Sequence, residues 1–374
     1  MKTAIVILNW NGKKLLEQFL PSIVNFSSEL ADIYVADNAS TDNSIAFIKE
    51  FFPVVHIVEN TTNGGYAKGY NDALKSIDAD IYCLINSDIE VSPNWIPPIM
   101  EVFKKEKNTA IIQPKILDYK QQETFEYAGA GGGFIDLYGY PYCRGRVFND
   151  LETDTNQYND TIEIFWASGA CFFIRSEVYQ FLNGFDEDYF AHQEEVDLCW
   201  RAQNEGYDVK YVGNSAVYHV GGATLQETNP QKTFLNFRNS LLNVIKNVPK
   251  QWFLFVVFSR LVLDGVAGIK FLVELRPIHT WAIIRAHISV YKNFYKFLQK
   301  RKRLQKKYNY NLHTSVVWQY FILRRKQFKN LRKDYRISVV PLPSLIIFGT
   351  ASVRSIIVDA NLHQNPPSIT PSNN

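Results

Sequence analysis

The sequence is poor in cysteine, with four in 374 residues, and none of them forms a CxxC pair. This argues against a disulfide-stapled mini-protein and the usual zinc and redox motifs, and it is compatible with a reducing compartment. No window of about 18 apolar residues is free of charge, so no clean transmembrane helix is expected. The apolar run that precedes Asn9 is too short for a signal peptide, and we interpret it as a strand.

Acidic residues are scarce in one segment of an otherwise ordinary globular composition, which itself excludes a disordered or collagen-like chain. Residues 285–336 hold 16 Lys and Arg against one acid, a net charge of +15. Residues 1–284 hold 23 Lys and Arg against 35 acids, a net charge of −12. A basic segment behind an acidic body predicts contact with an anionic surface, for which nucleic acid and anionic lipid are the two candidates.

Strands and helices alternate over the first hundred residues as in βαβ units, which predicts a parallel sheet with right-handed crossovers. The alternation breaks after about residue 115, where a glycine-rich, aromatic stretch predicts loops and short strands. Later segments predict a buried strand interrupted by Ser168-Gly169, a helix and a final strand. The expected strands lie at 4–8, 32–36, 54–58, 80–85, 164–174 and 209–218, and expected helices include 43–51, 66–77 and 194–205.

Polar residues follow several of these strands at the sheet edge where such folds bind ligands. Asp88 is placed to bridge a divalent cation to a diphosphate. Asp37 is placed to accept from a pyrimidine N–H or a ribose hydroxyl. Both positions are equally typical of turns and helix caps, so the pattern alone leaves the choice open. The other members of this group are Asn9, Asn11, Asn38 and Asn86.

Three further clusters carry candidate chemistry. Glycines at a helix start, in Asn63-Gly64-Gly65, let backbone N–H groups approach a ligand, although such a turn is also common without function. Three acids crowd together at Glu194, Glu195 and Asp197, and like charges raise a carboxylate's pKa, which suits a general base. The alternative is a solvated helix N-terminus. His219, at a strand end beside two glycines, is a metal ligand, a phosphate contact or a structural histidine.

The order of these pieces resembles the family 2 glycosyltransferases of the GT-A fold, in particular bacterial rhamnosyltransferase-like members. The matching segments span residues 4–222 and begin at Ile5, Val35, Asn63, Leu84, Ser168, Gly184, Glu194 and His219. The resemblance implies an α/β fold with a Rossmann-like, mostly parallel sheet and a helical C-terminal extension. We therefore expect a catalytic domain at 1–240, a basic, membrane-associating extension at 241–361 and a disordered tail at 362–374.

The resemblance also implies roles for individual residues. Asp37 would hold the nucleobase of the donor, and Asp88 and His219 would lie at a Mg²⁺ or Mn²⁺ ion beside the diphosphate. Asn86 departs from the acidic first position of the family's DXD motif, which weakens a two-carboxylate metal site. Glu195 matches the catalytic Asp of the family, with Glu194 and Asp197 as the next candidates. The other expected donor-binding residues are Asn9, Asn11, Asn38, Asn63, Gly64, Gly65 and Asn86.

The implied activity is that of a metal-dependent, inverting, hexosyltransferase-type enzyme of cell-surface polysaccharide synthesis. It would move a sugar, with rhamnose as the first candidate, from a nucleoside-diphosphate sugar to a glycan or polyprenyl-linked acceptor. Its place would be the inner face of the bacterial cytoplasmic membrane. The aromatic side chains expected to wall the acceptor site are Trp166, Tyr189 and Phe190.

The segment 252–275 predicts an amphipathic helix. Four charged residues fall within an arc of about 120° on a helical projection, and the remaining apolar face suits a membrane interface. Packing of this helix on the catalytic body is the alternative. The charged residues are Arg260, Asp264, Lys270 and Glu274. The segment that follows interleaves basic with aromatic residues, and such a segment is attracted to anionic lipid.

Three rival functions remain. A catalytically inactive nucleotide-binding scaffold is suggested by the changes at Asn86 and Glu195 and would bind nucleotide without transferring sugar. A nucleic-acid-binding protein would use residues 285–336, although we rank lipid first and expect no nucleic acid partner. A sugar-nucleotide pyrophosphorylase is disfavoured, because the first loop, Asn9-Trp10-Asn11-Gly12, lacks the basic, glycine-rich sequence which that class requires.

Overall fold

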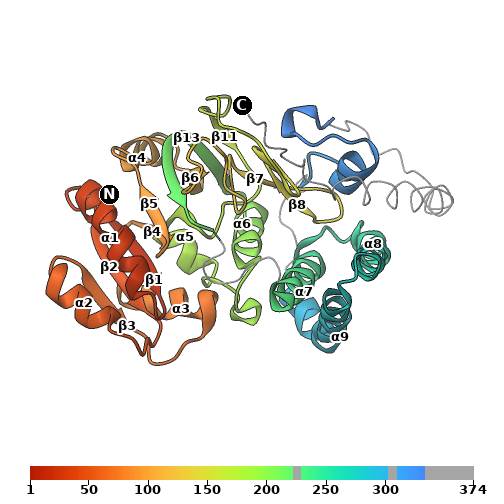
Figure 1. Ribbon diagram of the computed structural model, residues 1–374, viewed down its shortest axis with the longest axis horizontal. Helices are drawn as coiled ribbons and strands as arrows, with labels where there is room; N and C mark the ends of the chain where they lie inside the picture. The colour runs from red at the N-terminus through yellow and green to blue at the C-terminus, as the bar shows by residue number, and fades with distance from the viewer. Residues whose placement is uncertain (222–228, 302–309, 333–374) are drawn as a thin grey trace, which may run out of the picture.

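A nine-stranded mixed sheet forms the centre of the computed structural model, which describes residues 1–221, 229–301 and 310–332 (Figure 1). The strand order is β11-β13-β6-β12-β4-β1-β2-β3, and β5 pairs with β13. The strands are β1 Thr3–Asn9, β2 Asp32–Asp37, β3 His56–Glu59, β4 Ile81–Asn86, β5 Ile89–Val91, β6 Thr109–Asp118, β11 Thr161–Glu163, β12 Cys171–Arg175 and β13 Asp208–His219.

The sheet is mostly parallel, as expected. Strands β1 to β4 are parallel to one another, and β6 and β13 run in the same direction because antiparallel β12 separates them from β4. Of the expected strand 164–174, only Cys171–Arg175 joins this sheet. Phe165 and Trp166 bond elsewhere, since Phe165 N–H donates to the Gly133 carbonyl at 2.8 Å and Gly133 N–H donates to that of Trp166 at 3.1 Å.

Alternating side chains of the central strands build a separate core on each face of the sheet, as buried parallel strands require. Ile5 and Ile7 face a core that includes residues of α1 and α4, while Val6 and Leu84 face a core that includes residues of α3 and α6. The helices are α1 Lys13–Ser27, α2 Ser44–Phe51, α3 Gly65–Ala73, α4 Ile96–Lys105, α5 Ser176–Phe181, α6 Glu194–Asn204, α7 Pro230–Asn247, α8 Phe253–Val273 and α9 Pro277–Lys300.

A small antiparallel sheet occupies the region where the alternation breaks. Its strands are β7 Gly133–Ile135, β8 Pro141–Cys143, β9 Arg146–Val147 and β10 Asp150–Leu151. Part of the basic C-terminal segment packs on it: His313 Nδ1 lies 2.5 Å from the Tyr142 hydroxyl, and the ring of Phe328 lies 5.4 Å from that of Phe134. The expected disordered tail at 362–374 falls outside the described residues.

Helices α7, α8 and α9 gather at the side of the molecule opposite α2 and β3 (Figure 1). The boundary expected at residue 240 falls inside α7. This helix contacts both α6 and α9, so it connects the C-terminal helices to the part of the fold that holds the large sheet. Within the described residues, no helix combines the length and apolarity that crossing a bilayer requires.

The charged arc predicted for 252–275 does not face water as a unit. Arg260 and Asp264 are buried against the body, where Arg260 Nη1 donates to the Ser240 hydroxyl at 2.9 Å and Asp264 accepts from the Tyr140 hydroxyl at 2.9 Å. Only Lys270 and Glu274 are exposed, and they pair with each other. The helical projection correctly placed the four charged residues on one side of the helix. It does not reveal which of them pack against the rest of the protein.

Candidate functional site

The sheet changes its winding direction between β1 and β4. The chain runs outward from β1 through β2 to β3 and then returns to β4, on the other side of β1. Ligands of open α/β sheets bind at the carboxyl ends of the strands beside such a point. In the strand registers Asn9 pairs with Asp37 and Leu8 with Asn86, so the polar residues predicted from the sequence do meet at this edge.

Asn9 and Asp37 form the buried floor of this edge. Asn9 Nδ2 donates to Asp37 Oδ1 at 2.9 Å, and the Ser40 N–H donates to Asp37 Oδ2 at 2.8 Å. Asn9 Oδ1 is buried without a hydrogen-bond partner among the described residues. A Cβ at Gly12 would lie 2.4 Å from this oxygen, so glycine keeps the space in front of it open. An unpaired buried acceptor of this kind is satisfied when a ligand donates to it.

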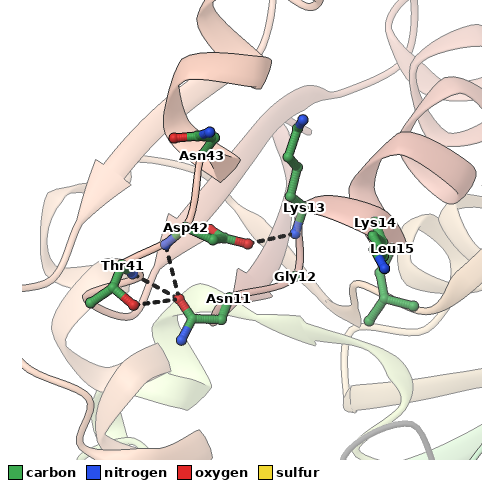
Figure 2. A pocket seen from close by; sticks show the side chains of 8 residues that line it. All are labelled: Asn11, Gly12, Lys13, Lys14, Leu15, Thr41, Asp42 and Asn43. Carbon is green, nitrogen blue, oxygen red and sulfur yellow. Dashed lines mark hydrogen bonds between the residues drawn. The ribbon is translucent and has the colours of Figure 1, made fainter.

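Asn11 organises the neighbouring loop. Its Oδ1 accepts from the Thr41 N–H at 2.7 Å and the Asp42 N–H at 3.2 Å, and Figure 2 shows this amide turned toward that loop. Asp42 in turn accepts from the Lys13 N–H at 3.0 Å at the start of α1. The hollow drawn there, of about 460 Å³, is open and shallow, and its lining is Asn11, Gly12, Lys13, Lys14, Leu15, Thr41, Asp42 and Asn43. Asn11 therefore shapes the sheet edge beside Asn9 and Asp37 through the 41–42 loop.

Asn63, Gly64 and Gly65 connect the end of β2, at Asn38, to the segment before α6. Asn63 Oδ1 accepts from the Gly65 N–H and from Asn38 Nδ2, both at 2.9 Å. Gly65 has a φ of +80°, and a Cβ there would lie 2.6 Å from the Phe190 carbonyl oxygen. Only glycine satisfies both conditions. The Gly65 N–H is thus used within the protein, and glycine serves close packing against Phe190 in place of the ligand approach that we expected.

Asp88 and His219 lie together at the ends of β4 and β13. His219 Nε2 is 3.2 Å from Asp88 Oδ1, and His219 Nδ1 is 3.3 Å from Glu126 Oε1. Burial disfavours the charged imidazole, but the two carboxylates outweigh burial and raise the pKa of His219 to about 10. Glu126 was missed by the sequence analysis, since nothing in its glycine-rich stretch marks it. A Cβ at Gly221 would lie 2.8 Å from the carboxylate of Glu126.

These residues fit a cation that is shared with a ligand. Among the described residues, no group of three or more His, Cys, Asp and Glu side chains has the geometry to hold a metal ion alone. Mg²⁺ is commonly bound by one or two carboxylates together with substrate phosphates. Asp88 offers one carboxylate, and His219 offers a nitrogen once its proton has left. Asp88 is only 6% exposed, so its position is well defined for this purpose.

Glu194 and Glu195 stand at the first turn of α6. Burial raises the pKa of Glu195 to about 7, even though backbone N–H groups at the helix start favour its ionised form. Burial, followed by the charge of Glu195, raises the pKa of Glu194 well above its usual range. Glu194 is 3% exposed, and its Oε2 has no hydrogen-bond partner among the described residues. Glu195 is the more accessible of the two, and a carboxylate with a pKa near 7 suits a general base.

The segment Ser168-Gly169-Ala170 joins the two halves of the site. The Ala170 carbonyl accepts from the Asn86 N–H at 2.9 Å, at the end of β4. A Cβ at Gly169 would lie 3.8 Å from the carboxylate carbon of Glu195 and 3.2 Å from the Tyr66 hydroxyl. That hydroxyl donates to the Gly169 carbonyl at 2.6 Å. Two adjacent residues therefore lie beside the Asn86 end of β4 and beside Glu195, and glycine leaves the space in front of Glu195 free.

Asp197 is engaged by partners inside the protein. It is fully buried, and it accepts from Arg201 Nε at 2.7 Å, Lys246 Nζ at 2.9 Å and Asn247 Nδ2 at 2.9 Å. Although burial opposes the charge, these cations and hydrogen bonds hold the pKa of Asp197 well below its usual range. A carboxylate so fully engaged cannot accept a proton from a substrate hydroxyl, so we assign Asp197 a positioning role in α6.

The loop before α6 is strained and is held by α7. Phe190, His192 and Gln193 have φ values of 66°, 68° and 72°, a region that costs non-glycine residues about 1–3 kcal/mol each. Asn239 Nδ2 lies within 2.7–3.1 Å of the carbonyl oxygens of Tyr189, Ala191 and His192. Asn243 Nδ2 donates to the Gln193 carbonyl at 3.1 Å. The sequence analysis missed these residues, whose helical spacing is equally typical of an exposed face.

Of the aromatic side chains expected to wall the acceptor site, only Phe190 is exposed, by 50%. Trp166 is buried, and its Nε1 donates to the Phe134 carbonyl at 2.9 Å. Tyr189 is fully buried, and its hydroxyl donates to Asn243 Oδ1 at 2.7 Å. Trp166 and Tyr189 are therefore core residues.

Comparison with known proteins finds the glycosyl transferase family 2 domain over residues 4–182. The chain is 24% identical over 233 residues to an N-acetylglucosaminyl-diphospho-decaprenol L-rhamnosyltransferase of Mycobacterium tuberculosis, covering 58% of this chain and 75% of the relative. It is 22% identical over 247 residues to a low-salt glycan biosynthesis hexosyltransferase of Haloferax volcanii, covering 64% of this chain and 74% of the relative.

Solved structures also match this chain at low sequence identity. A mannosyltransferase of Pyrobaculum calidifontis in complex with GDP-Man and Mn²⁺ superposes with a TM-score of 0.47 and 13% identity, covering 80% of this chain and 84% of that one. TarS of S. aureus in complex with UDP-GlcNAc superposes with a TM-score of 0.49 and 14% identity, covering 80% and 91%.

Proposed function

Because the chain belongs to glycosyl transferase family 2 and has the GT-A fold expected for it, we propose that this glycosyltransferase is metal-dependent and inverting. The proposed donor is a nucleoside-diphosphate sugar, with dTDP-rhamnose as the first candidate, and the proposed acceptor is a glycan or polyprenyl-diphosphate-linked sugar. The rhamnosyltransferase name of the mycobacterial relative supports both choices. A polyprenyl acceptor would place the reaction at the inner face of the cytoplasmic membrane.

One observation carries the proposal: a Cβ at Gly169 would lie 3.8 Å from the carboxylate carbon of Glu195, and the next residue, Ala170, accepts from the Asn86 N–H at 2.9 Å. This segment therefore connects a carboxylate with a pKa near 7 to the strand end that leads to Asp88, which pairs with His219. A base on one side of the anomeric carbon and a diphosphate site on the other are what a single in-line displacement requires.

The proposed mechanism assigns each step to a residue of this chain. Asn9 and Asp37 bind the nucleoside part of the donor, and Asp88 with His219 would hold Mg²⁺ or Mn²⁺. That cation, when bound, would neutralise the charge that develops on the leaving diphosphate. Glu195 accepts the proton of the acceptor hydroxyl as its oxygen forms the new bond to the anomeric carbon. The bond to the diphosphate breaks at the same time, and the anomeric configuration inverts.

The test is nucleoside diphosphate release from a panel of sugar nucleotides, with membrane lipid extract as the source of acceptor and with Mn²⁺ or EDTA. We expect release from one donor only, dependent on metal, and a product of inverted anomeric configuration by NMR. Release without metal, or a retained configuration, would contradict this mechanism. Nucleotide binding without release from any donor, using an extract shown to contain a usable acceptor, would favour the scaffold alternative.

A further inference from the structure

In the hairpin of α8 and α9, helix α8 buries a charged pair, Arg260 and Asp264, and exposes apolar residues. On α8 the buried positions recur every four residues, at Val256, Arg260, Asp264 and Gly268. On the opposite side of the helix, Phe258, Val262 and Val266 are exposed by 50–58%. A surface helix of a soluble protein usually buries its apolar face and exposes its charged face, because burial of apolar surface drives packing.

Exposed apolar side chains are concentrated at the tip of this hairpin. Of the 29 large hydrophobic residues that are exposed in the described part of the chain, 14 lie within residues 254–295. Seven of these belong to the tip, residues 269–284, and are Ile269, Leu272, Val273, Leu275, Ile278, Trp281 and Ile284. The tip is closed by a hydrogen bond from the Thr280 hydroxyl to the Gly268 carbonyl at 2.8 Å, so the two helices present these side chains together. Exposed apolar surface of this extent marks an interaction site.

Leu275 shows most clearly that the tip is built for contact. It is 89% exposed, and its backbone has a φ of 57°. Glycine or asparagine usually occupies such a position after a helix, because other residues are strained there. Neither burial nor backbone conformation within this chain therefore explains a leucine at this position. A partner outside the chain that receives the side chain would explain it.

The charge around the tip favours an anionic surface as that partner. Residues 250–300 hold eight Lys and Arg against two acids. Four of these cations pair with carboxylates, and the other four are Lys250, Arg276, Arg285 and Lys292. Trp281, Tyr291 and Tyr295 are exposed on α9 among these basic residues. Aromatic and basic side chains in this mixture are typical of the headgroup region of a bilayer.

We propose that the α8–α9 hairpin tip, residues 269–284, inserts its apolar side chains into the headgroup region of an anionic lipid bilayer. A second copy of the chain fits less well, because a two-fold contact would bring the same basic surface against itself. The inference goes beyond the sugar-transfer proposal and does not depend on it, since lipid binding is measured without donor or acceptor.

The decisive variant is Leu275→Gly, because the two effects of this change have opposite signs. Glycine removes the backbone strain at residue 275 and is expected to leave the melting temperature unchanged or higher. It also removes an inserted leucine, which is expected to weaken vesicle binding by at least about tenfold. Co-sedimentation of the full chain with phosphatidylcholine vesicles, with and without phosphatidylglycerol, measures the binding.

Two matched pairs of variants complete the test. Trp281→Glu, at 56% exposure, is expected to abolish vesicle binding, whereas Phe51→Glu, at 60% exposure on α2, is expected to leave it unchanged. Lys292→Ala is expected to weaken binding to phosphatidylglycerol vesicles about fivefold, with Lys104→Ala as its control. Equal losses within either pair, or no vesicle binding by the wild type, would overturn the proposal. So would a dimer in sedimentation velocity that Leu275→Gly dissociates while vesicle binding stays the same.

Discussion

Lys246 of α7 lies 2.9 Å from Asp197 of α6, and both side chains are almost completely buried. The same ammonium group lies 2.8 Å from Asp186, in the segment that leads to α6. This one lysine therefore links the helix that carries Glu195 both to the preceding segment and to the C-terminal helices.

Replacing Lys246 should destabilise the fold. In Lys246→Met, Asp197 and Asp186 lose a shared cation in a buried setting, and we expect a loss of about 3 kcal/mol in the free energy of unfolding. Chemical denaturation measures it, with the exposed Lys250→Met as the matched control. A loss no larger than that of the control would show that the pair contributes nothing to stability.

Asn239 should affect catalysis more than binding. Its amide holds three carbonyl groups of the strained loop before α6, so Asn239→Ala frees that loop and misplaces Glu195. We expect kcat for nucleoside diphosphate release to fall by about tenfold or more, while KM for the donor stays within twofold or so of wild type. Asn293→Ala, whose amide bonds only its own helix, is the control. A change in donor KM alone would contradict the positioning role.

Glu194 should make stability depend on pH in a defined direction. Its folded pKa is raised above the ordinary value of 4.5, so the unfolded chain releases this proton at a lower pH than the folded chain does. The contribution of Glu194 to stability is therefore full below pH 4.5 and is lost as pH rises.

The variant Glu194→Gln removes this dependence. Its melting temperature should exceed that of wild type by about 2 °C or more at pH 8, and the difference should vanish near pH 4. The exposed Glu177→Gln should change the melting temperature little at either pH. A gain of equal size at both pH values would mean that packing, and not ionisation, is responsible.

Asp88 should control metal binding in the presence of nucleotide. Calorimetric titration of Mn²⁺ into the protein with nucleoside diphosphate should show at least about tenfold weaker binding for Asp88→Asn, as expected for the loss of a charged ligand. Asp78→Asn, with a side chain that is 99% exposed, should bind Mn²⁺ like the wild type. Unchanged affinity in Asp88→Asn would place the cation elsewhere.

The strand ends were predictable from the sequence because parallel strands bring their carboxyl ends to one edge. Asn9, Asp37, Asp88 and His219 follow apolar runs, so their approximate positions depended only on the fold class. Glu126 was not predictable, since it meets His219 through contacts between residues 93 positions apart in the chain.

The orientation of α8 shows a second limit of sequence analysis. Arg260 and Asp264 are four residues apart and neutralise each other, which allows the charged side of the helix to be buried. Helical periodicity identifies the charged side but not the partner that covers it. The roles of Asn239 and Lys246 were missed for the same reason, because each depends on which face of α7 packs on α6.

The most direct test of the central claim is the pH dependence of kcat/KM for nucleoside diphosphate release, in wild type and in Glu195→Gln. Glu195 has a pKa of about 7 and must be deprotonated to accept a proton, so the wild-type rate should rise through pH 7 and then level off. Glu195→Gln should lower the rate by about 10²–10⁴-fold and abolish that rise. A variant with the same rising limb and a rate near that of wild type would show that another group is the base.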